Sequence, residues 1–360
     1  MPKIPRRLSL ITETASVLRQ RIHDGDWSLR LPGEVELSTH LQVGRNTIRG
    51  ALKLLEQEGL LVTRNGQRRE IVALPSSPHA SRRAVLLMAK SENEYPPSTS
   101  AWIRETQSRL ENQGWSFRLL IEPGLYRGNP LRQLRALVTG SPDTVWILHR
   151  STPTMQRWFQ ESSFPVVLAG SRHEGIELPQ VEVDLRAVSR HAAGAFLARG
   201  HQRLAILRPE GPFAGDAECV AGFRDTASRI DVVELRSKGG PAGVVAVLRR
   251  HLLDRHPATG LFILHPDHCL TALSFLLSEG VHVPGDLSVI CRDDEPYLAL
   301  LHPEPARYRH STRTFGSKLA TLVVRATGEK PVAAPPSLVM PRAVGGATLG
   351  PAPPVLKRNR

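Results

Sequence analysis

The sequence predicts a small helical head with a β-hairpin, joined by a linker to a larger body made of two α/β lobes. Residues 1–74 contain short amphipathic helical patterns, whereas beyond residue 84 apolar, β-rich runs alternate with segments of helical length. Residues 75–83, PSSPHASRR, separate the two regions and have a composition typical of a linker. This change of pattern predicts two structural units rather than one.

The composition favours a globular protein with an anionic partner. The 360 residues are 41% hydrophobic, enough for a sizeable core, and the formal net charge is +13. Such a charge suits nucleic acid, although a basic protein without that role would have it too. Three cysteines are too few for a disulfide framework, and neither a membrane span nor a signal peptide is visible. We therefore expect a cytoplasmic protein.

The head begins with two predicted helices. Ile11, Ala15, Leu18 and Ile22 form one apolar stripe at helical spacing, and Asp24, Gly25 and Asp26 end that helix. LPGE then turns the chain, and residues 34–41 can form a second, short helix.

The third helix of the head carries a basic face. It lies in GRNTIRGALKLLEQEGLL, residues 44–61, after a tight turn that we expect at Gly44 and before a C-terminal cap at Gly59. One face is apolar, with Ile48, Ala51, Leu52 and Leu55. The opposite face is basic, with Arg45, Arg49 and Lys53. We have no sequence-based explanation for Gly50 inside this helix.

A basic hairpin follows the third helix directly. Asn65-Gly66 supplies the positive-φ residues of a tight turn between two short β-prone runs. The hairpin carries Arg64, Arg68 and Arg69. A lone basic stripe is usually a solvated face, but a basic helix followed by a basic hairpin is typical of a winged helix-turn-helix that binds DNA.

Residues 31–72, LPGEVELSTHLQVGRNTIRGALKLLEQEGLLVTRNGQRREIV, resemble the winged helix of GntR-type bacterial regulators. The resemblance implies that Arg45 and Arg49 reach guanine edges or phosphates in the major groove. It implies that Asn46 and Thr47 contact phosphate or base, and that Gly66 lies at the wing tip in the minor groove. Val35 and Gly44 depart from the usual Arg and Ser or Thr of the family, which indicates a different sequence preference.

The body has the pattern of parallel sheets covered on both faces. Apolar β-rich runs occupy residues 84–89, 117–121, 144–149, 165–170, 203–208, 260–264 and 287–291. Helical patterns fill many of the intervals, among them 185–199, 241–255 and 268–280. We expect two α/β lobes over residues 84–348 and a disordered tail over residues 349–360.

Polar residues follow several of these strands. Ligands bind open α/β sheets beyond the carboxyl ends of the strands, so the side chains there are candidates for effector binding. They are Ser91, His149, Arg150, His265, Asp267 and Asp293. Each could be an ordinary loop residue, but their shared position after strands favours a common cleft.

The body also resembles the effector domain of LacI-type regulators, which is related to periplasmic sugar-binding proteins. The resemblance rests on RGHQRLAIL (199–207), AGFRDTA (221–227) and VPGDLSVICRDDEPYLALLHPEP (283–305). It implies a periplasmic-binding-protein-like domain with parallel sheets, an effector between two lobes, and dimerisation. Asp293 matches an acidic effector ligand, whereas Cys219 stands where the family has Arg, and His265-Pro266 replaces Asn-Asp. Cys219 is thus a candidate effector position with an altered side chain.

The sequence gives less support to a metal site or to an enzyme. HPDHC, residues 265–269, contains metal-binding residue types, but five adjacent residues at a strand-to-helix turn converge poorly on one ion. Phosphate loops, nucleophile elbows and zinc-protease motifs are not found. We expect no cofactor and no catalytic residues.

The sequence therefore predicts a regulator, most simply a homodimeric repressor. Two heads would read an inverted-repeat operator in double-stranded DNA, and a sugar-like small molecule in the cleft would control them. A dimeric DNA-binding protein with a lost or non-sugar pocket is the main alternative. A sugar-active enzyme with a vestigial head would need a catalytic pair that the sequence does not offer.

Overall fold

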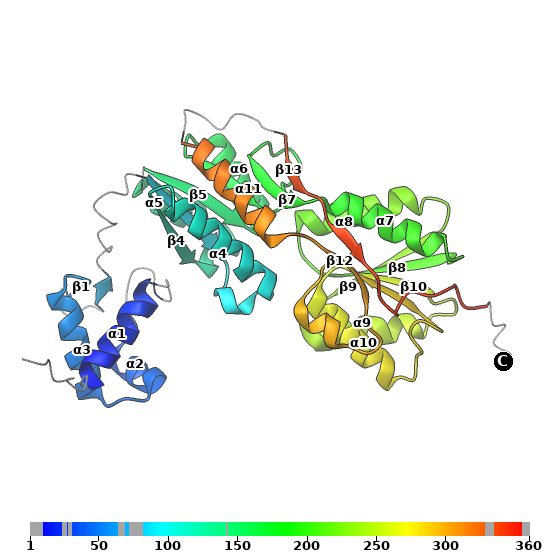
Figure 1. The fold of residues 1–360 in the computed structure, drawn as a ribbon, viewed down its shortest axis with the longest axis horizontal. Coiled ribbons are helices and arrows are strands. Elements are labelled where there is room, and N and C mark those ends of the chain that lie inside the picture. Colours follow the sequence, from blue (N-terminus) through cyan, green and yellow to red (C-terminus); the bar gives the residue numbers. More distant parts are fainter. Residues whose placement is uncertain are drawn as a thin grey trace, which may run out of the picture.

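In the computed structural model the chain forms a helical head followed by two α/β lobes (Figure 1). The structure describes residues 10–23, 27, 31–63, 69–71, 82–141, 143–327 and 335–354. Within them, none of the helices is both long and apolar enough to cross a membrane.

The head packs three helices around one apolar core. Its elements are α1 (Leu10–His23), α2 (Glu34–Leu41), α3 (Arg45–Gln57), β1 (Leu61–Val62) and β2 (Glu70–Ile71). The predicted apolar stripes of α1 and α3 face this core, where Leu18 and Ile48 are fully buried. β1 pairs antiparallel with β2, as a wing requires, and the predicted Asn65-Gly66 turn lies outside the described residues.

The turns of the head differ in part from the prediction. Gln42, with φ 53°, is the left-handed residue between α2 and α3. Gly44 is extended, with φ −62°, and serves as the N-cap of α3. Gly59, with φ 75°, follows the C-cap of α3 in the expected left-handed conformation. A Cβ on Gly50 would lie 2.9 Å from Ile11 Cδ1, so this glycine permits the close approach of α1 and α3.

Lobe 1 is a six-stranded sheet with strand order β13-β7-β6-β5-β3-β4, and all its pairs are parallel. Its strands are β3 (Arg82–Met88), β4 (Trp115–Ile121), β5 (Thr144–His149), β6 (Val166–Ala169), β7 (Gln180–Val183) and β13 (Ser337–Val339). α4 (Pro97–Glu111) and α11 (Thr312–Arg325) cover one face (Figure 1). α5 (Leu131–Thr139) and α6 (Pro153–Glu161) cover the other. The short helices η1 (Glu92–Glu94) and η2 (Pro123–Tyr126) follow β3 and β4.

Lobe 2 is a second six-stranded sheet, with strand order β14-β12-β11-β10-β8-β9. Its strands are β8 (Arg203–Pro209), β9 (Asp231–Ser237), β10 (Gly260–Ile263), β11 (Ser288–Cys291), β12 (Ala306–Arg309) and β14 (Arg342–Val344). The β12–β14 pair is antiparallel and the others are parallel. α7 (Leu185–Leu197) and α8 (Ala214–Thr226) cover one face, and α9 (Gly240–Leu252) and α10 (Pro266–Ser278) cover the other. η3 (Pro296–Leu300) follows β11.

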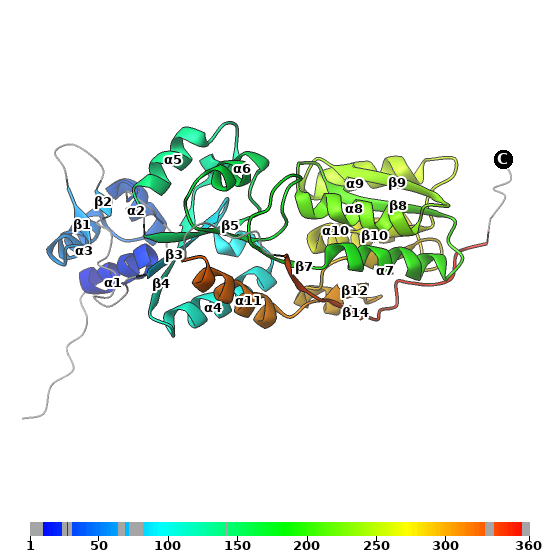
Figure 2. The same cartoon turned by 90° about the horizontal axis from the view of Figure 1, so that it is seen from above.

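The chain passes between the lobes at residues 183–185, 309–312 and 339–342. α11 and β13 therefore belong to lobe 1 although they follow most of lobe 2 in the sequence (Figure 2). β7 of lobe 1 and β12 of lobe 2 both end at such crossings, so the two lobes face each other where the chain passes between them.

The predicted α/β body is confirmed, and its end lies later than expected. Ala352 N donates to Arg199 O, and His201 Nε2 lies 3.2 Å from Gly350 O. Residues 349–352 are therefore packed against lobe 2, whereas we expected a disordered tail from residue 349. Residues 355–360 lie outside the described part of the chain.

Candidate functional site

The exposed face of α3 carries the side chains predicted to meet DNA. Arg45, Asn46, Arg49 and Lys53 are exposed, and Thr47 is half-buried. The side chain of Arg49 is 64% exposed, and its Nε lies 2.7 Å from Glu34 Oε2. A surface ion pair of this kind is weak, so Arg49 can exchange Glu34 for a phosphate or a base at little cost.

Arg69, directly before β2, contacts two carboxylates of the head. Its Nε lies 2.7 Å from Glu56 Oε1 and its Nη1 lies 3.1 Å from Glu34 Oε1. These contacts join the start of β2 to α2 and α3. Arg69 therefore links these elements of the head, and its contact with DNA stays a prediction. Arg64, Gly66 and Arg68, the other predicted contacts of the wing, lie outside the described residues.

A cavity of about 200 Å³ lies between the two lobes. Lobe 1 lines it with the start of α4 and the segments that follow β5 and β6, and lobe 2 with the start of α8 and the segments that follow β10 and β11. The predicted residues His149, Arg150, His265 and Asp293 all line this cavity. The carboxyl ends of strands from both sheets thus meet at one site, as expected for an α/β ligand cleft.

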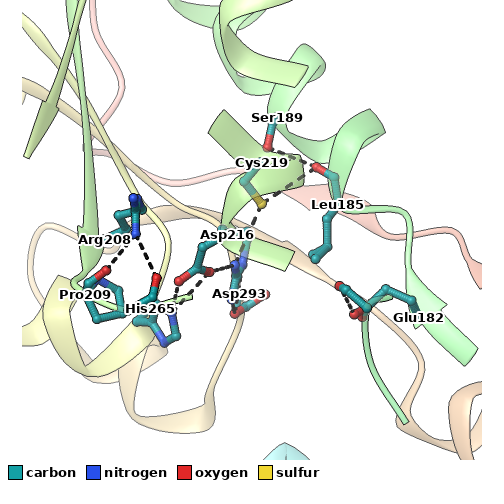
Figure 3. Close-up of polar contacts among 12 residues, drawn as sticks. Glu182, Leu185, Ser189, Arg208, Pro209, Asp216, Cys219, His265 and Asp293 are labelled. Carbon is teal, nitrogen blue, oxygen red and sulfur yellow. Dashed lines mark hydrogen bonds and ion pairs between the residues drawn. The ribbon is translucent and has the colours of Figure 1, made fainter. Parts of the chain in front are cut away.

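Arg292 holds the lobe 2 side of the cavity together. This arginine is buried, with Nη1 at 2.7 Å from Asp216 Oδ1 and Nη2 at 2.8 Å from Asp293 Oδ2. His265 Nε2 lies 3.2 Å from the other oxygen of Asp216, and Figure 3 shows Asp216 beside His265. Burial alone would raise the pKa of Asp216, but the contacts with His265 and Arg292 lower it. Asp216 is therefore a carboxylate.

Cys219 lies behind this network rather than in the cavity lining. Its sulfur is fully buried on α8, 3.9 Å from Leu185 O and 3.7 Å from Arg292 Nη1 (Figure 3). Burial raises the pKa of this thiol to about 11, so it is uncharged. Where the LacI-type effector domain has Arg, this chain thus has the small side chain of Cys219. The guanidinium beside Cys219 belongs to Arg292, which follows β11.

His149 on the lobe 1 side is a neutral hydrogen-bond acceptor. Its Nδ1 lies 3.1 Å from Ala169 O, and because a carbonyl only accepts, Nδ1 carries the proton. Burial and the nearby Arg150 lower the pKa of His149 to about 4, so the ring is uncharged at neutral pH. Its Nε2 is buried without a hydrogen-bond partner among the described residues. Tyr95 and Trp102 pack edge-on against this ring.

Two contacts cross between the lobes at the cavity. Ser98 of α4 donates its hydroxyl and its backbone N–H to the buried carboxyl of Glu295. Arg150, in the left-handed region with φ 49°, places its guanidinium 5.1 Å from the centre of the Phe213 ring. A non-glycine residue in this conformation is strained, which is common where a side chain must be aimed at a site. These contacts link the two lobes at the cavity.

Ser91, Cys219 and Asp267 were predicted to bind the effector, but none of them lines the cavity. Ser91 caps η1, where its Oγ lies 2.9 Å from Glu94 Oε1. Asp267 is exposed in the first turn of α10, because that helix begins at Pro266, two residues before the expected start. A strand-following position was therefore too coarse a criterion for Ser91 and Asp267, and the family position was too coarse for Cys219.

Several cavity residues were not predicted from the sequence. They are Trp102, Glu182, Asp216, Arg292 and Glu295. Arg292 and Glu295 flank the predicted Asp293, and their proximity in the sequence was a usable signal. Glu182 lies on β7, a strand that the apolar pattern did not reveal because it is short and carries a charge.

The residues of HPDHC do not converge on one point. His265 faces Asp216, Asp267 is exposed, and Cys269 is buried inside lobe 2. Over the whole described part of the chain, no three His, Cys, Asp or Glu side chains are grouped as a metal ion would require.

Two segments of the chain match different protein families. The family of bacterial regulatory proteins named gntR matches residues 10–71, and the periplasmic binding protein-like domain matches residues 193–349. No curated protein matches the sequence.

Solved structures resemble the body. A LacI family transcriptional regulator from Bifidobacterium animalis subsp. lactis DSM 10140 is 17% identical, with a TM-score of 0.63, over 76% of this chain and 99% of that one. A LacI family regulator from Enterococcus faecium with bound ribose is 18% identical, with a TM-score of 0.61, over 75% and 99%. Another from Enterococcus faecalis V583, also with bound ribose, is 13% identical, with a TM-score of 0.61, over 75% and 99%. At these identities the likeness concerns the fold.

Proposed function

We infer that this chain, a DNA-binding transcription regulator that joins a GntR-type helix-turn-helix domain to a periplasmic-binding-protein-like domain, is a homodimeric repressor that releases its operator when a sugar-like molecule binds between the lobes. Arg45, Asn46, Thr47, Arg49 and Lys53 would face the major groove. Two heads related by two-fold symmetry would read an inverted repeat.

The observation that carries this proposal is the interlobe cavity itself. Its polar groups come from both lobes, with His149 and Glu182 on one side and Asp293 on the other. A ligand that contacts both lobes binds the closed arrangement more tightly than an open one, and it therefore shifts the population toward closure. Two structures of similar fold contain bound ribose, which supports a hydroxyl-rich ligand for this chain.

The path to the DNA runs through lobe 1. The described part of lobe 1 begins with β3 at Arg82, directly after the linker that joins it to the head. In a dimer, rotation of one lobe against the other would change the spacing of the two heads. The spacing of half-sites on DNA is fixed, so this movement would couple the ligand to the operator.

The test needs an operator first. We would select binding duplexes from a randomised DNA pool and measure the affinity of the full chain by fluorescence anisotropy, with and without candidate ligands. A compound that stabilises the protein thermally and weakens operator binding at least tenfold would support the proposal.

Specific DNA binding that no stabilising compound changes would favour the alternative, a dimeric DNA-binding protein without a sensing pocket. The altered Cys219 and His265-Pro266 positions are the observations that favour this second function. Failure to select any duplex would contradict both.

A further inference from the structure

We propose that the interlobe cavity selects a hydroxyl-bearing ligand that carries a positively charged amine, such as an amino sugar or an amino alditol. This inference rests on the proposed function, because it assumes that the effector occupies this cavity. It goes beyond that function by giving the charge of the effector.

The charged groups of the lining are predominantly acidic. The carboxyl groups are those of Glu182, Asp216, Asp293 and Glu295. The guanidinium groups are those of Arg150 and Arg292. Burial lowers the pKa values of three of the lining histidines, His149, His173 and His310, so these rings add no positive charge at neutral pH, and the fourth, His265, is already in contact with Asp216 at 3.2 Å.

The guanidinium of Arg292 is already occupied. Its Nη1 contacts Asp216, and its Nε and Nη2 lie 3.1 Å and 2.8 Å from Asp293 Oδ2. A carboxylate or phosphate on the ligand would have to displace one of these buried carboxylates. An anionic effector that binds Arg292 would therefore leave a buried charge without its partner, at a large cost.

Glu182 is the acidic group that most needs a partner. It accepts hydrogen bonds from the Ser171 hydroxyl at 2.5 Å and from the Val183 backbone at 2.7 Å, and no basic side chain pairs with it among the described residues. Burial is the main cause that raises its pKa, and Asp293 on the opposite lobe also raises it, whereas the hydrogen bonds from Ser171 and Val183 and the nearby Arg292 lower it. Arg292 thus offsets the repulsion from Asp293, but it does not pair with Glu182. A cation beside Glu182 would stabilise this buried carboxylate directly.

The uncharged part of the lining also suits a cationic donor. The unpartnered Nε2 of His149 can only accept a hydrogen bond, because Nδ1 holds the proton. The hydroxyls of Ser98 and Ser171 already donate to Glu295 and Glu182. An ammonium group donates three hydrogen bonds and accepts none, which fits a site whose free groups are acceptors.

Aromatic rings complete the lobe 1 side of the cavity. Tyr95, Trp102 and Phe315 line it, with 5.3 Å between the ring centres of Trp102 and Phe315. Ring faces attract cations as well as the apolar faces of sugar rings. Rings on lobe 1 and carboxylates on both lobes together favour an amine over a neutral polyol, and a neutral polyol over an anion.

The test compares ligands that differ only in charge. The panel contains glucosamine, glucose and glucuronate; galactosamine, galactose and galacturonate; and the open-chain set of glucamine, sorbitol and gluconate. Thermal shift of the full chain at pH 7 gives a first ranking, and titration calorimetry gives the affinities. We expect the amine of at least one set to bind at least tenfold more tightly than its neutral parent. We expect the acid of that set to cause no thermal shift.

Glu182→Gln supplies the matching variant. The amide keeps an oxygen for the Ser171 hydroxyl but removes the charge, so the preference for the amine over its neutral parent should fall at least tenfold. Glu177→Gln, an exposed change in the same lobe, should keep it. An unchanged preference in Glu182→Gln would overturn the role of this carboxylate.

The two proposals fail differently. A shift caused by a neutral or acidic member, with the amine equal or weaker, overturns the cation inference and leaves ligand sensing intact. If no member of the panel shifts the melting temperature while operator binding is intact, the result counts against both proposals.

Discussion

Arg49 and Arg69 are both arginines of the head, but their surroundings give them different roles. Arg49 is 64% exposed and holds one carboxylate, whereas Arg69 is 24% exposed and bridges Glu34 and Glu56. Contacts with Glu56 and Glu34 raise the pKa of Arg69 against the effect of burial. We therefore expect Arg49 to take part in DNA recognition and Arg69 to support the wing.

Substitution separates these roles. Arg49→Ala should weaken specific operator binding by about 1–3 kcal/mol, the usual contribution of a bidentate base contact, and leave stability nearly unchanged. Arg69→Ala should destabilise the head by about 1–3 kcal/mol, because two charge-assisted hydrogen-bond partners lose their donor. Anisotropy and thermal unfolding measure the two effects, with Arg19→Ala, which breaks the surface pair with Glu58, as a control. Loss of DNA affinity in Arg69→Ala without loss of stability would reverse the assignment.

His149 predicts a dependence of stability on pH. Its pKa is about 4 in the folded protein, below the ordinary value of 6.5, so the unfolded chain takes up this proton first as the pH falls. The contribution of the neutral His149 to the free energy of unfolding is therefore complete above pH 6.5 and is lost progressively toward pH 4. The loss is roughly 3 kcal/mol, at about 1.4 kcal/mol for each pH unit between the two pKa values.

The variant His149→Gln tests this dependence. The amide can still donate to Ala169 O but does not titrate, so the fall in the free energy of unfolding between pH 6.5 and 4 should be smaller than in the wild type. Urea unfolding at several pH values measures it. His302→Gln, an exposed change, should leave the wild-type slope. Parallel curves for the wild type and His149→Gln would contradict the buried neutral state.

At the scale of elements, α4 and α11 determine the shape of lobe 1 at the cavity. α4 carries Ser98 and Trp102, and α11 carries Phe315. The two helices approach closely at Gly316, where an added Cβ would lie 2.8 Å from Trp102 O and 2.8 Å from Glu105 Cβ. A backbone oxygen cannot move aside as a flexible side chain can, so this glycine sets the distance between the helices.

Gly316→Ala should therefore destabilise the body by about 1–3 kcal/mol through overpacking. It should also weaken ligand binding, since α4 would move at the cavity. Gly194→Ala is the matched control, because its Cβ would meet nothing within 4 Å on α7. That change should instead stabilise the helix by about 0.5–1 kcal/mol. Equal effects of the two changes on the melting temperature would contradict the proposed close contact.

At the scale of the whole molecule, exposed leucines of lobe 2 are candidates for contact with a second copy of the chain. Leu270 and Leu277 share one face of α10, and the exposed fractions of Leu277 and Leu300 are 79% and 85%. A monomer gains nothing from exposed leucines at these positions, whereas burying each one in a dimer would contribute roughly 1.5–3 kcal/mol. We expect the homodimer to use this surface.

Leu277→Glu should shift the chain from dimer to monomer and weaken binding to an inverted repeat more than to a half-site. Sedimentation velocity and anisotropy measure the two effects. Met340→Glu places the same charge at another exposed apolar residue, on the segment between β13 and β14, and should leave the dimer intact. A dimer of unchanged affinity in Leu277→Glu would move the interface elsewhere.

Much of the fold was predictable because its elements have strong local patterns. The apolar stripes of α1 and α3, and the runs that became β3, β5, β8, β10 and β11, reflect burial on one or both faces. β7, β9, β12, β13 and β14 were not predicted, because they are short or carry charges and depend on neighbouring strands for pairing. The exposed basic residues of α3 and the cavity positions of His149, Arg150, His265 and Asp293 followed from their places next to such elements.

The sequence by itself determined that a basic helix-turn-helix precedes a body of two α/β lobes, because helical and strand periodicities are local properties of the chain. Only the tertiary structure decided which polar groups meet. Arg292 fills the space beside Cys219, Glu182 faces a cavity shared with Asp293, and Arg69 turns toward two carboxylates. These partners lie far apart in sequence, and the crossings between the lobes bring the cavity residues together. Long-range ion pairs and burial leave no periodic trace in the chain, and so they could not be predicted from it.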